Sequence, residues 1–318
     1  MITTDVDIAV KALIADEIIA IPTETVYGLA GNAFSETALK KIFDLKKRPF
    51  YNPLIVHIKS AAYLTEVACD IPEIALKLAK KFWPGPLTLL LKKRSIIPDL
   101  VTAGKETVAV RMPDHSLTLT LLEHLDFPLA APSANPFGSI SPTTAEHVAN
   151  YFKNTLDVIL DGGNCEKGLE STIIGFEENK PILFRLGAIS MEDIENEIGK
   201  VGIKNEGTET DITAPGMLSR HYSPDTNTYL TDNIAEQLNL FKNKKIGLLL
   251  FKERVETDVI EHQEILSDTG NLQEAAKGLY AALHRLDKLH LDVIIAERFP
   301  NYGLGKTIND RLQRAVKK

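Results

Sequence analysis

Short apolar runs recur along the first two thirds of the chain, and segments with a helical period separate them. The runs are IIAIPT, PLIVHI, LTLLL, VAVRM, PLAAP, VILDGG, STIIGF and PILFRL. Their length and their content of branched residues are typical of buried strands. SETALKKIFDLKK and EIALKLAKKFW instead place apolar residues on one face of a helix. This alternation predicts an α/β domain.

Two serines mark the starts of helices in this domain. Ser35 precedes a helical pattern that begins near Glu36, where its hydroxyl can accept a hydrogen bond from an exposed backbone amide. Ser190, followed by Asp193, predicts a capping box for a helix that ends near Gly199. We expect that helix to close the first domain.

The chain changes character after residue 204. Residues 205–226 are polar, contain two prolines and show no period, which is the composition of a linker. Beyond them KKIGLLLF, a helical pattern from Asn271 to about Leu289, and the run LDVIIAE predict a smaller α/β unit. A chain of 318 residues also exceeds the usual size of one hydrophobic core. We therefore predict a first domain over 1–204, a linker over 205–226 and a second domain over 227–318.

Composition narrows the class of protein. Hydrophobic residues make up 44% and charged residues 25%, and no apolar run approaches the ~20 residues of a membrane helix. The N-terminal segment carries acids where a targeting peptide would carry basic residues. Cys69 and Cys165 lie far apart and form no C-x-x-C pair, which argues against a disulfide framework or a zinc site. We expect a cytoplasmic protein with no membrane segment and no metal site of its own.

The distribution of charge points to an anionic ligand. A net charge of −7 disfavours a protein whose main role is to coat nucleic acid, because phosphate neutralisation requires an excess of basic residues. Such an excess exists locally between residues 40 and 60, with a net charge of +5. The charged residues there are Lys40, Lys41, Asp44, Lys46, Lys47, Arg48 and Lys59.

The segment KKRPFYNPLIVH combines cations with two prolines. Lys46 and Arg48 stand at the end of a predicted helix, where they could simply face its C-terminal dipole in solvent. The prolines stiffen the backbone, which favours presenting Lys46, Arg48 and Asn52 to a ligand at little entropic cost. Guanidinium and ammonium groups suit phosphate oxygens. His57, at the end of the next strand, is by itself more typical of a structural histidine.

Three further segments place polar groups beside strands. PTETVYGL, which contains Thr25, follows a predicted strand and is either a ligand-binding turn or an ordinary connection. In APSANP, Ser133 and Asn135 can face one ligand or can form a local turn. Arg111 and Arg185 each lie in an apolar strand, so each requires a ligand anion or a structural salt bridge.

The sequence lacks the standard phosphate loops and catalytic motifs. GLGKT at residues 303–307 is similar to the end of a P-loop, but the first glycine of that motif would fall at Pro300. No G-x-S-x-G, H-E-x-x-H or Cys/His cluster occurs. The candidate site residues are rich in cations and hydroxyls and include no obvious nucleophile.

Seven motifs in one order resemble the threonylcarbamoyl-AMP synthase family, whose catalytic unit is the YrdC-type domain. They are PTETVYGL, KKRP-x-x-NPL-x-x-H, WPGPLT, VAVRMP, APSANPFG-x-x-S, GLESTI and ILFRLGA. APGMLSRHYSP, followed by a small α/β unit, is similar to the long two-domain form. Leu186 departs from the family pattern, which has proline after the arginine. The resemblance implies a twisted mixed sheet with flanking helices and a concave cationic site, plus a smaller Rossmann-like C-terminal domain.

The resemblance also implies a reaction. L-Threonine and bicarbonate give N-carboxythreonine, whose carboxylate attacks the α-phosphate of ATP, releasing pyrophosphate and leaving threonylcarbamoyl-AMP. This is a nucleotidyltransferase reaction with ATP as substrate, and Mg²⁺ is expected with the ATP. A tRNA threonylcarbamoyl transferase would then use the product to make N6-threonylcarbamoyladenosine at tRNA position 37. Such catalysis depends on positioning and charge neutralisation.

Carried over residue by residue, the family pattern assigns two groups of contacts. The residues expected to contact ATP are Lys46, Arg48, Asn52, Thr107, Ser133, Asn135, Ser141, Arg185, His221 and Tyr222, with Lys46 and Arg48 carrying catalysis. The residues expected to contact threonine are Thr25, His57, Arg111, Ser171 and the backbone at Ala131. Arg111 would take the amino-acid carboxylate as a bidentate pair. The linker would cover the site as a lid that excludes water.

Three other functions are compatible with parts of this sequence. An RNA-binding module could use the same cationic hollow, although the acidic composition and the lack of interleaved aromatic residues count against more than a weak RNA contact. Carbamoyltransferases of hydrogenase maturation contain a similar domain, but their cysteine-rich zinc motifs are missing from this sequence. The C-terminal unit could merely support the linker, in which case deletion after Pro224 would leave activity intact.

Overall fold

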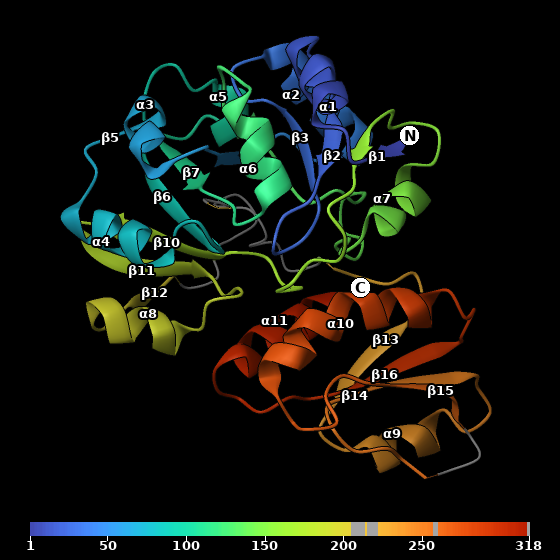
Figure 1. Ribbon diagram of the computed structural model, residues 1–318. Helices are drawn as coiled ribbons and strands as arrows, with labels where there is room; N and C mark the ends of the chain where they lie inside the picture. Colours follow the sequence, from blue (N-terminus) through green and yellow to red (C-terminus); the bar gives the residue numbers. More distant parts are fainter. Residues whose placement is uncertain (205–213, 215–221, 257–259, 317–318) are drawn as a thin grey trace.

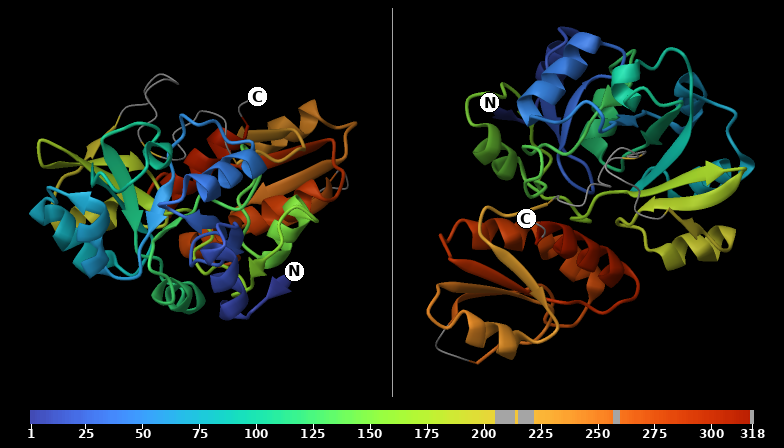
Figure 2. Two further views of the ribbon diagram at one scale, coloured as in Figure 1. Left: turned by 90° about the horizontal axis from the view of Figure 1, so that it is seen from above. Right: turned by 180° about the vertical axis from the view of Figure 1, so that it is seen from behind.

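The computed structural model describes residues 1–204, 214, 222–256 and 260–316, which form two α/β units (Figure 1). The first unit is built on a 12-stranded sheet and the second on a 4-stranded sheet. Views from two further directions show the second unit lying against one side of the first (Figure 2). Among the helices of the described residues, none has both the length and the apolar character needed to cross a bilayer.

The large sheet is mixed, in the order β1-β9-β2-β3-β8-β4-β7-β6-β10-β11-β12, and β5 pairs with β6 outside this path. Its strands are β1 (Ile2–Thr3), β2 (Ile19–Ile21), β3 (Gly28–Asn32), β4 (Ile55–His57), β5 (Ala68–Cys69), β6 (Leu87–Lys93), β7 (Thr107–Arg111), β8 (Leu129–Ala130), β9 (Ile159–Leu160), β10 (Thr172–Glu177), β11 (Lys180–Arg185) and β12 (Gly202–Ile203). Strand β7 runs parallel to β4 and antiparallel to β6. The eight apolar runs of the sequence coincide with strands, so those predictions are confirmed.

Helices pack around this sheet. They are α1 (Val6–Ile14), α2 (Glu36–Lys46), η1 (Ala61–Tyr63), α3 (Leu64–Val67), α4 (Glu73–Phe82), α5 (Asp99–Thr102), α6 (Ser116–Glu123), α7 (Ala145–Phe152) and α8 (Met191–Ile198). Ser35 Oγ accepts from the Ala38 amide at 3.3 Å and Ser190 Oγ from the Asp193 amide at 3.1 Å, which confirms both predicted N-caps. Asp5 caps α1, a helix that the sequence analysis did not anticipate.

The smaller unit is a parallel sheet in the order β13-β16-β14-β15. Its elements are β13 (Thr228–Thr231), α9 (Ile234–Leu240), β14 (Ile246–Leu250), β15 (Ile260–Ile265), α10 (Leu272–Asp287), β16 (Val293–Glu297) and α11 (Leu304–Ala315). Helices α10 and α11 cover the face of this sheet that points toward the large unit, while α9 covers the opposite face (Figure 1). The small unit therefore meets the large one through two helices.

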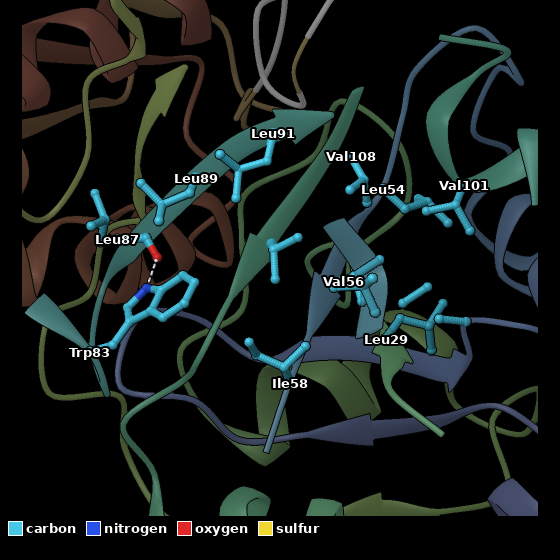
Figure 3. Packing of buried hydrophobic residues seen from close by; sticks show 14 of the residues in the cluster. Leu29, Leu54, Val56, Ile58, Trp83, Leu87, Leu89, Leu91, Val101 and Val108 are labelled. Atoms are coloured by element: carbon cyan, nitrogen blue, oxygen red, sulfur yellow. Dashed lines mark hydrogen bonds between the residues drawn. The ribbon is translucent and has the colours of Figure 1, made fainter. Parts of the chain in front are cut away.

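The motif WPGPLT connects the core of the large unit with the end of β7. Trp83, the only tryptophan of the chain, is 9% exposed, and its Nε1 donates to the Leu87 carbonyl over 2.7 Å (Figure 3). The amide of Gly85 donates to the Met112 carbonyl at 2.9 Å, and its own carbonyl accepts from Arg111 Nε at 3.3 Å. This turn therefore helps to orient the arginine that ends β7.

Candidate active site

A cavity of about 560 Å³, counting the part open to solvent, lies in the large unit where several strands end. His57, Arg111 and Arg185 are the last residues of β4, β7 and β11, and all three face it. The lining residues are Thr23, Thr25, Val26, Gly28, Arg48, Ile55, His57, Arg111, Ala131, Pro132, Ser133, Glu170, Ser171, Arg185 and Tyr222. A lining that mixes apolar residues with a few convergent polar and charged groups is typical of a small-molecule site.

The five residues expected to contact threonine all line this cavity. They are Thr25, His57, Arg111, Ala131 and Ser171. They come from the turn after β2, the ends of β4 and β7, the segment after β8 and the residue directly before β10. The mixed order of the sheet thus gathers in one place residues that are up to 146 positions apart, from 25 to 171.

Arg111 is fixed on three sides. Its Nη1 donates to Thr25 Oγ1 over 2.9 Å and its Nε to the Gly85 carbonyl over 3.3 Å. Its Nη2 lies 2.6 Å from Glu24 Oε2, with both side chains at least 95% buried. Neither of these two atoms makes a well-aligned hydrogen bond among the described residues, so charge attraction holds the pair together. Glu24 was not anticipated as a functional residue, although it lies within the motif PTETVYGL.

His57 is a neutral ring in this setting. Burial, together with the nearby positive charge of Arg111, lowers the pKa of His57 to about 3. Its Nδ1 lies 3.3 Å from the Ile55 carbonyl, which suits an Nδ1–H donor. The Nε2 atom then carries a lone pair, so the ring can accept a hydrogen bond from a ligand.

The residues expected to contact ATP divide into two groups. Arg48, Ser133, Arg185 and Tyr222 line the cavity. Lys46, Asn52 and Ser141 bond to lining residues, and Asn135 accepts from Lys46. Thr107 lies apart, at the start of β7 opposite Lys92 of β6. His221 and most of the predicted lid lie outside the described residues.

Lys46 and Arg48 are buried cations rather than a solvated helix cap. The ammonium of Lys46 donates to the carbonyls of Ser133 and Asn135. Arg48 donates from Nη2 to Asn52 Oδ1 and to the Pro53 carbonyl, both over 2.7 Å. Burial and the neighbouring charge of Arg48 lower the pKa of Lys46 well below its usual value. A bound anion would relieve this desolvation and repulsion.

Arg185 adds a third cation to the same wall. Its guanidinium donates to the Ser171 carbonyl over 2.8 Å and to Ser171 Oγ over 3.0 Å. Burial lowers the pKa of Arg48 to about 9; a favourable interaction with Tyr222 opposes this shift, and Arg185 adds to it. The cavity is therefore electropositive on the side that Arg48 and Arg185 share.

Two buried amides on this side have unused bonding capacity. Asn52 is 0% exposed and Asn135 is 1% exposed. Within the described part of the chain, Asn52 Nδ2 and Asn135 Oδ1 have no hydrogen-bond partner. Buried polar groups are almost always paired in folded proteins, so these two atoms indicate a partner that binds from outside the described residues.

Glu170 is a lining residue that the sequence analysis did not select. It is 7% exposed and accepts hydrogen bonds from Ser141 Oγ, from the Tyr280 hydroxyl and from Arg311 Nε. Glu170 belongs to the motif GLESTI. Its three hydrogen-bond partners, however, come from the motif APSANPFG-x-x-S, which contains Ser141, and from the small unit. Local sequence patterns give no signal for such distant partners.

Comparisons with known proteins cover both units. A family described as Telomere recombination matches residues 11–187, and a second described as Threonylcarbamoyl-AMP synthase, C-terminal domain matches residues 189–316. The chain is 42% identical over 312 residues to the threonylcarbamoyl-AMP synthase of Pyrococcus abyssi, covering 94% of this chain and 90% of that protein. It is 40% identical over 326 residues to the Bacillus subtilis enzyme of the same name, covering 99% and 94%.

The fold matches a solved structure over nearly its whole length. The crystal structure of Pyrococcus abyssi Sua5 complexed with L-threonine superposes with a TM-score of 0.90 at 41% identity. The match covers 98% of this chain and 94% of that one. Both units and their arrangement are therefore common to the two proteins.

Proposed function

The chain belongs to the threonylcarbamoyl-AMP synthase family, and on that premise we propose that it converts L-threonine, bicarbonate and ATP into threonylcarbamoyl-AMP, pyrophosphate and water. The chain is an enzyme, and we assign it to the nucleotidyltransferases. One observation carries the proposal: a single cavity combines an arginine suited to a carboxylate with a separate group of buried cations suited to phosphates.

We place threonine beside Arg111. The guanidinium would take the carboxylate of the amino acid, exchanging part of its pairing with Glu24 for a ligand that approaches from the cavity. Thr25, His57, Ser171 and the backbone of Ala131 would surround the rest of the substrate. The neutral His57 can accept a hydrogen bond from the amino group or from the hydroxyl without adding positive charge.

We place the phosphates of ATP against Arg48, Arg185 and Ser133, with Lys46 behind them. The attack of the N-carboxythreonine carboxylate on the α-phosphate brings two anions together, so buried cations lower the barrier by neutralising their charge. Asn52 and Asn135 would supply the donor and the acceptor that have no partner in the described residues. Thr107 and Ser141 stay predicted nucleotide contacts, although Thr107 lies at the start of β7, opposite Lys92, and does not line the cavity.

Mg²⁺ is expected to accompany the ATP. Among the described residues no three His, Cys, Asp or Glu side chains gather into a metal site. Glu170 is the lining carboxylate, and both of its oxygens already accept hydrogen bonds. The residues therefore do not form a protein cage for the ion, which would be held by phosphate oxygens and water, as Mg²⁺ often is at triphosphates.

We further propose that residues 1–204 form the catalytic domain, 205–226 a lid and 227–318 a supporting domain. The end of β12 at Ile203 and the start of β13 at Thr228 agree with these limits. Tyr222, the described residue next to His221, is 1% exposed and lines the cavity. Because both the carboxylated intermediate and the adenylate are labile, a covering segment would protect them from water. Release in the cytoplasm would bring the product to a tRNA threonylcarbamoyl transferase.

A product assay tests this proposal. Purified chain should release pyrophosphate from ATP only when threonine and bicarbonate are both present. Lys46→Ala and Arg48→Ala should each abolish the product while the melting temperature stays near that of the wild type. Lys47→Ala is the matched control, because Lys47 is exposed and should leave activity unchanged. Wild-type turnover in either of the first two variants would contradict the assignment of phosphate contacts.

A further inference from the structure

A buried ion pair joins the two units at the wall of the cavity. Arg311 of α11 donates from Nε to Glu170 Oε2 over 2.9 Å, and the two residues are 141 positions apart. Their side chains are 1% and 9% exposed. The arginine belongs to the small unit, whereas the glutamate lines the cavity of the large one. The small unit therefore reaches the back of the proposed active site.

The guanidinium of Arg311 also holds the backbone that follows Arg185. Its Nη2 donates to the Leu186 carbonyl over 2.6 Å. Four residues earlier on α11, Thr307 Oγ1 donates to the Gly187 carbonyl over 3.0 Å. Two successive carbonyls after Arg185 are thus fixed by a single helix of the small unit, which limits the positions that the Arg185 guanidinium can occupy.

Arg311 further supports the aromatic part of the wall. Its guanidinium carbon lies 4.9 Å from the ring centroid of Tyr222, and the ring of Tyr280 stacks against Tyr222 with centroids 5.7 Å apart. Tyr222 has a φ of 65°, a left-handed conformation that a bulky residue adopts only where its surroundings impose it. The cation and the second ring are two of the contacts that hold this side chain in the cavity.

Glu170 completes the arrangement from the other side. Its Oε1 accepts from Ser141 Oγ at 2.7 Å and its Oε2 also accepts from the Tyr280 hydroxyl at 2.9 Å. Burial would raise the pKa of this carboxyl, but the charges of Arg311 and Arg185 and the hydrogen bond from Ser141 outweigh burial and lower it. The ionised carboxylate is thus neutralised by Arg311 and does not oppose an anionic ligand.

These contacts select one side of the cavity. Ser141, Arg185 and Tyr222 are all assigned to the nucleotide. Within the described residues, Arg311 bonds directly to none of the residues assigned to threonine, although one of them, Ser171, accepts hydrogen bonds from Arg185. A buried ion pair is a poor source of stability by itself, because apolar residues of equal volume often do as well. The concentration of its contacts on the nucleotide side therefore calls for a reason other than stability.

We propose that Arg311 is a positioning residue for ATP, acting through Glu170, the Leu186 carbonyl and Tyr222. The small unit is then part of the active site and not only a support for the preceding segment. This inference rests on the proposed function, since the nucleotide side is defined by it. It differs from that proposal in naming a residue and a unit that the family motifs leave without a role.

Substitution of Arg311 should affect the use of ATP but not the binding of threonine. In Arg311→Met we expect kcat/KM for ATP to fall by roughly 10- to 100-fold, the size of effect that small misplacements in an active site produce. The Kd for threonine, measured by calorimetry without ATP, should stay within about twofold of the wild type, because Arg311 makes no direct contact with the residues assigned to threonine. Arg311→Lys should recover part of the activity, since lysine restores the charge but not the planar fork that bonds to Glu170 and to the Leu186 carbonyl at once.

Three controls keep the outcome interpretable. Arg285→Met removes a different arginine–glutamate pair, with Glu264, inside the small unit, and should leave both substrates unaffected. If Arg311→Met does not fold, Glu170→Gln tests the same contact, with the same expected loss on the ATP side. In the double variant Arg311→Met/Glu170→Gln, the fold loss of kcat/KM for ATP should be smaller than the product of the two single losses if both residues act through one contact.

The results that would overturn the inference are distinct from those that would overturn the proposed function. A wild-type chain that makes no threonylcarbamoyl-AMP contradicts the proposed function. An active wild type whose Arg311→Met and Glu170→Gln variants keep normal kcat/KM for ATP contradicts the positioning role. Equal losses of threonine binding and of ATP use, together with a lowered melting temperature, would show a merely structural role and also contradict it.

Discussion

Two buried arginine–glutamate pairs flank the cavity, and they differ in how completely they are bonded. Arg111 and Glu24 lie 2.6 Å apart within the large unit, and both oxygens of Glu24 lack a hydrogen bond among the described residues. Arg311 and Glu170 lie 2.9 Å apart across the two units, and both oxygens of Glu170 accept hydrogen bonds. The incompletely bonded pair can still receive a ligand, whereas the saturated pair can only hold its neighbours in place.

The largest effect should follow from removing Arg111. In Arg111→Leu the buried Glu24 loses its countercharge, which costs about 3–5 kcal/mol of folding free energy. Threonine binding should also be lost. Urea unfolding measures the first quantity and calorimetry the second. Glu24→Gln in the same chain should restore part of the stability but not the binding; threonine binding retained in Arg111→Leu would refute the assignment of the carboxylate site.

Gly305→Ala should disturb the Arg311–Glu170 pair indirectly, by shifting the helix that carries Arg311. A Cβ there would lie 1.9 Å from the Pro300 carbonyl oxygen, so α11 must shift and carry Arg311 with it. We expect Gly305→Ala to lose up to about 3 kcal/mol in urea unfolding and to raise KM for ATP but not the Kd for threonine. Gly278→Ala on α10, where the nearest atom is 3.4 Å away, is the matched control; it should leave the KM for ATP unchanged and keep or slightly raise stability, because alanine favours a helix interior.

Acid should destabilise the protein through His284, which contacts the carbonyl of Ser141 close to the Arg311–Glu170 pair. Burial lowers the pKa of His284 to about 4; a hydrogen bond to the Ser141 carbonyl opposes the shift and Lys288 adds to it. The folded state therefore excludes a proton that the unfolded chain binds below about pH 6.5, so stability falls as the pH drops from 6.5 toward 4. Between pH 7 and 5 the wild type should lose about 1–2 kcal/mol more than His284→Gln in urea unfolding. Equal losses in the two chains would contradict this.

The smallest effect is expected at a partly exposed contact between the units. Lys306 Nζ lies 2.7 Å from Glu192 Oε1, with side chains 33% and 43% exposed. Such pairs contribute less than about 1 kcal/mol. Lys306→Gln should therefore change the melting temperature little and leave the KM for ATP unchanged. A large rise in that KM would instead indicate that GLGKT binds phosphate.

One member of the Arg111–Glu24 pair could be predicted from the sequence, whereas neither member of the Arg311–Glu170 pair could. Arg111 stands in an apolar strand, so its need for a partner could be predicted. Arg311 stands in a polar helix pattern that suits a solvent-facing surface, and nothing local indicates that it is 1% exposed. Its partner Glu170 is 141 positions away, and contacts at such separation depend on how the units dock.

The same distinction holds for the fold. The longer strands and the caps at Ser35 and Ser190 follow from local preferences and were predicted. Two-residue strands such as β1 and β12 have no recognisable pattern, because their pairing partners define them. Helix α1 did carry a local signal, an Asp5 cap before an amphipathic stretch, and could have been found.

Trp83 gives this two-unit architecture a built-in optical reporter. It is the only tryptophan and is packed in the core of the large unit, so fluorescence excited at a wavelength that tyrosine does not absorb reports on that unit alone. Circular dichroism, in contrast, records the helices of both units. Superimposable unfolding curves from the two signals would show that the units melt together, and a gap between them would measure how far the small unit can detach while the catalytic core stays folded.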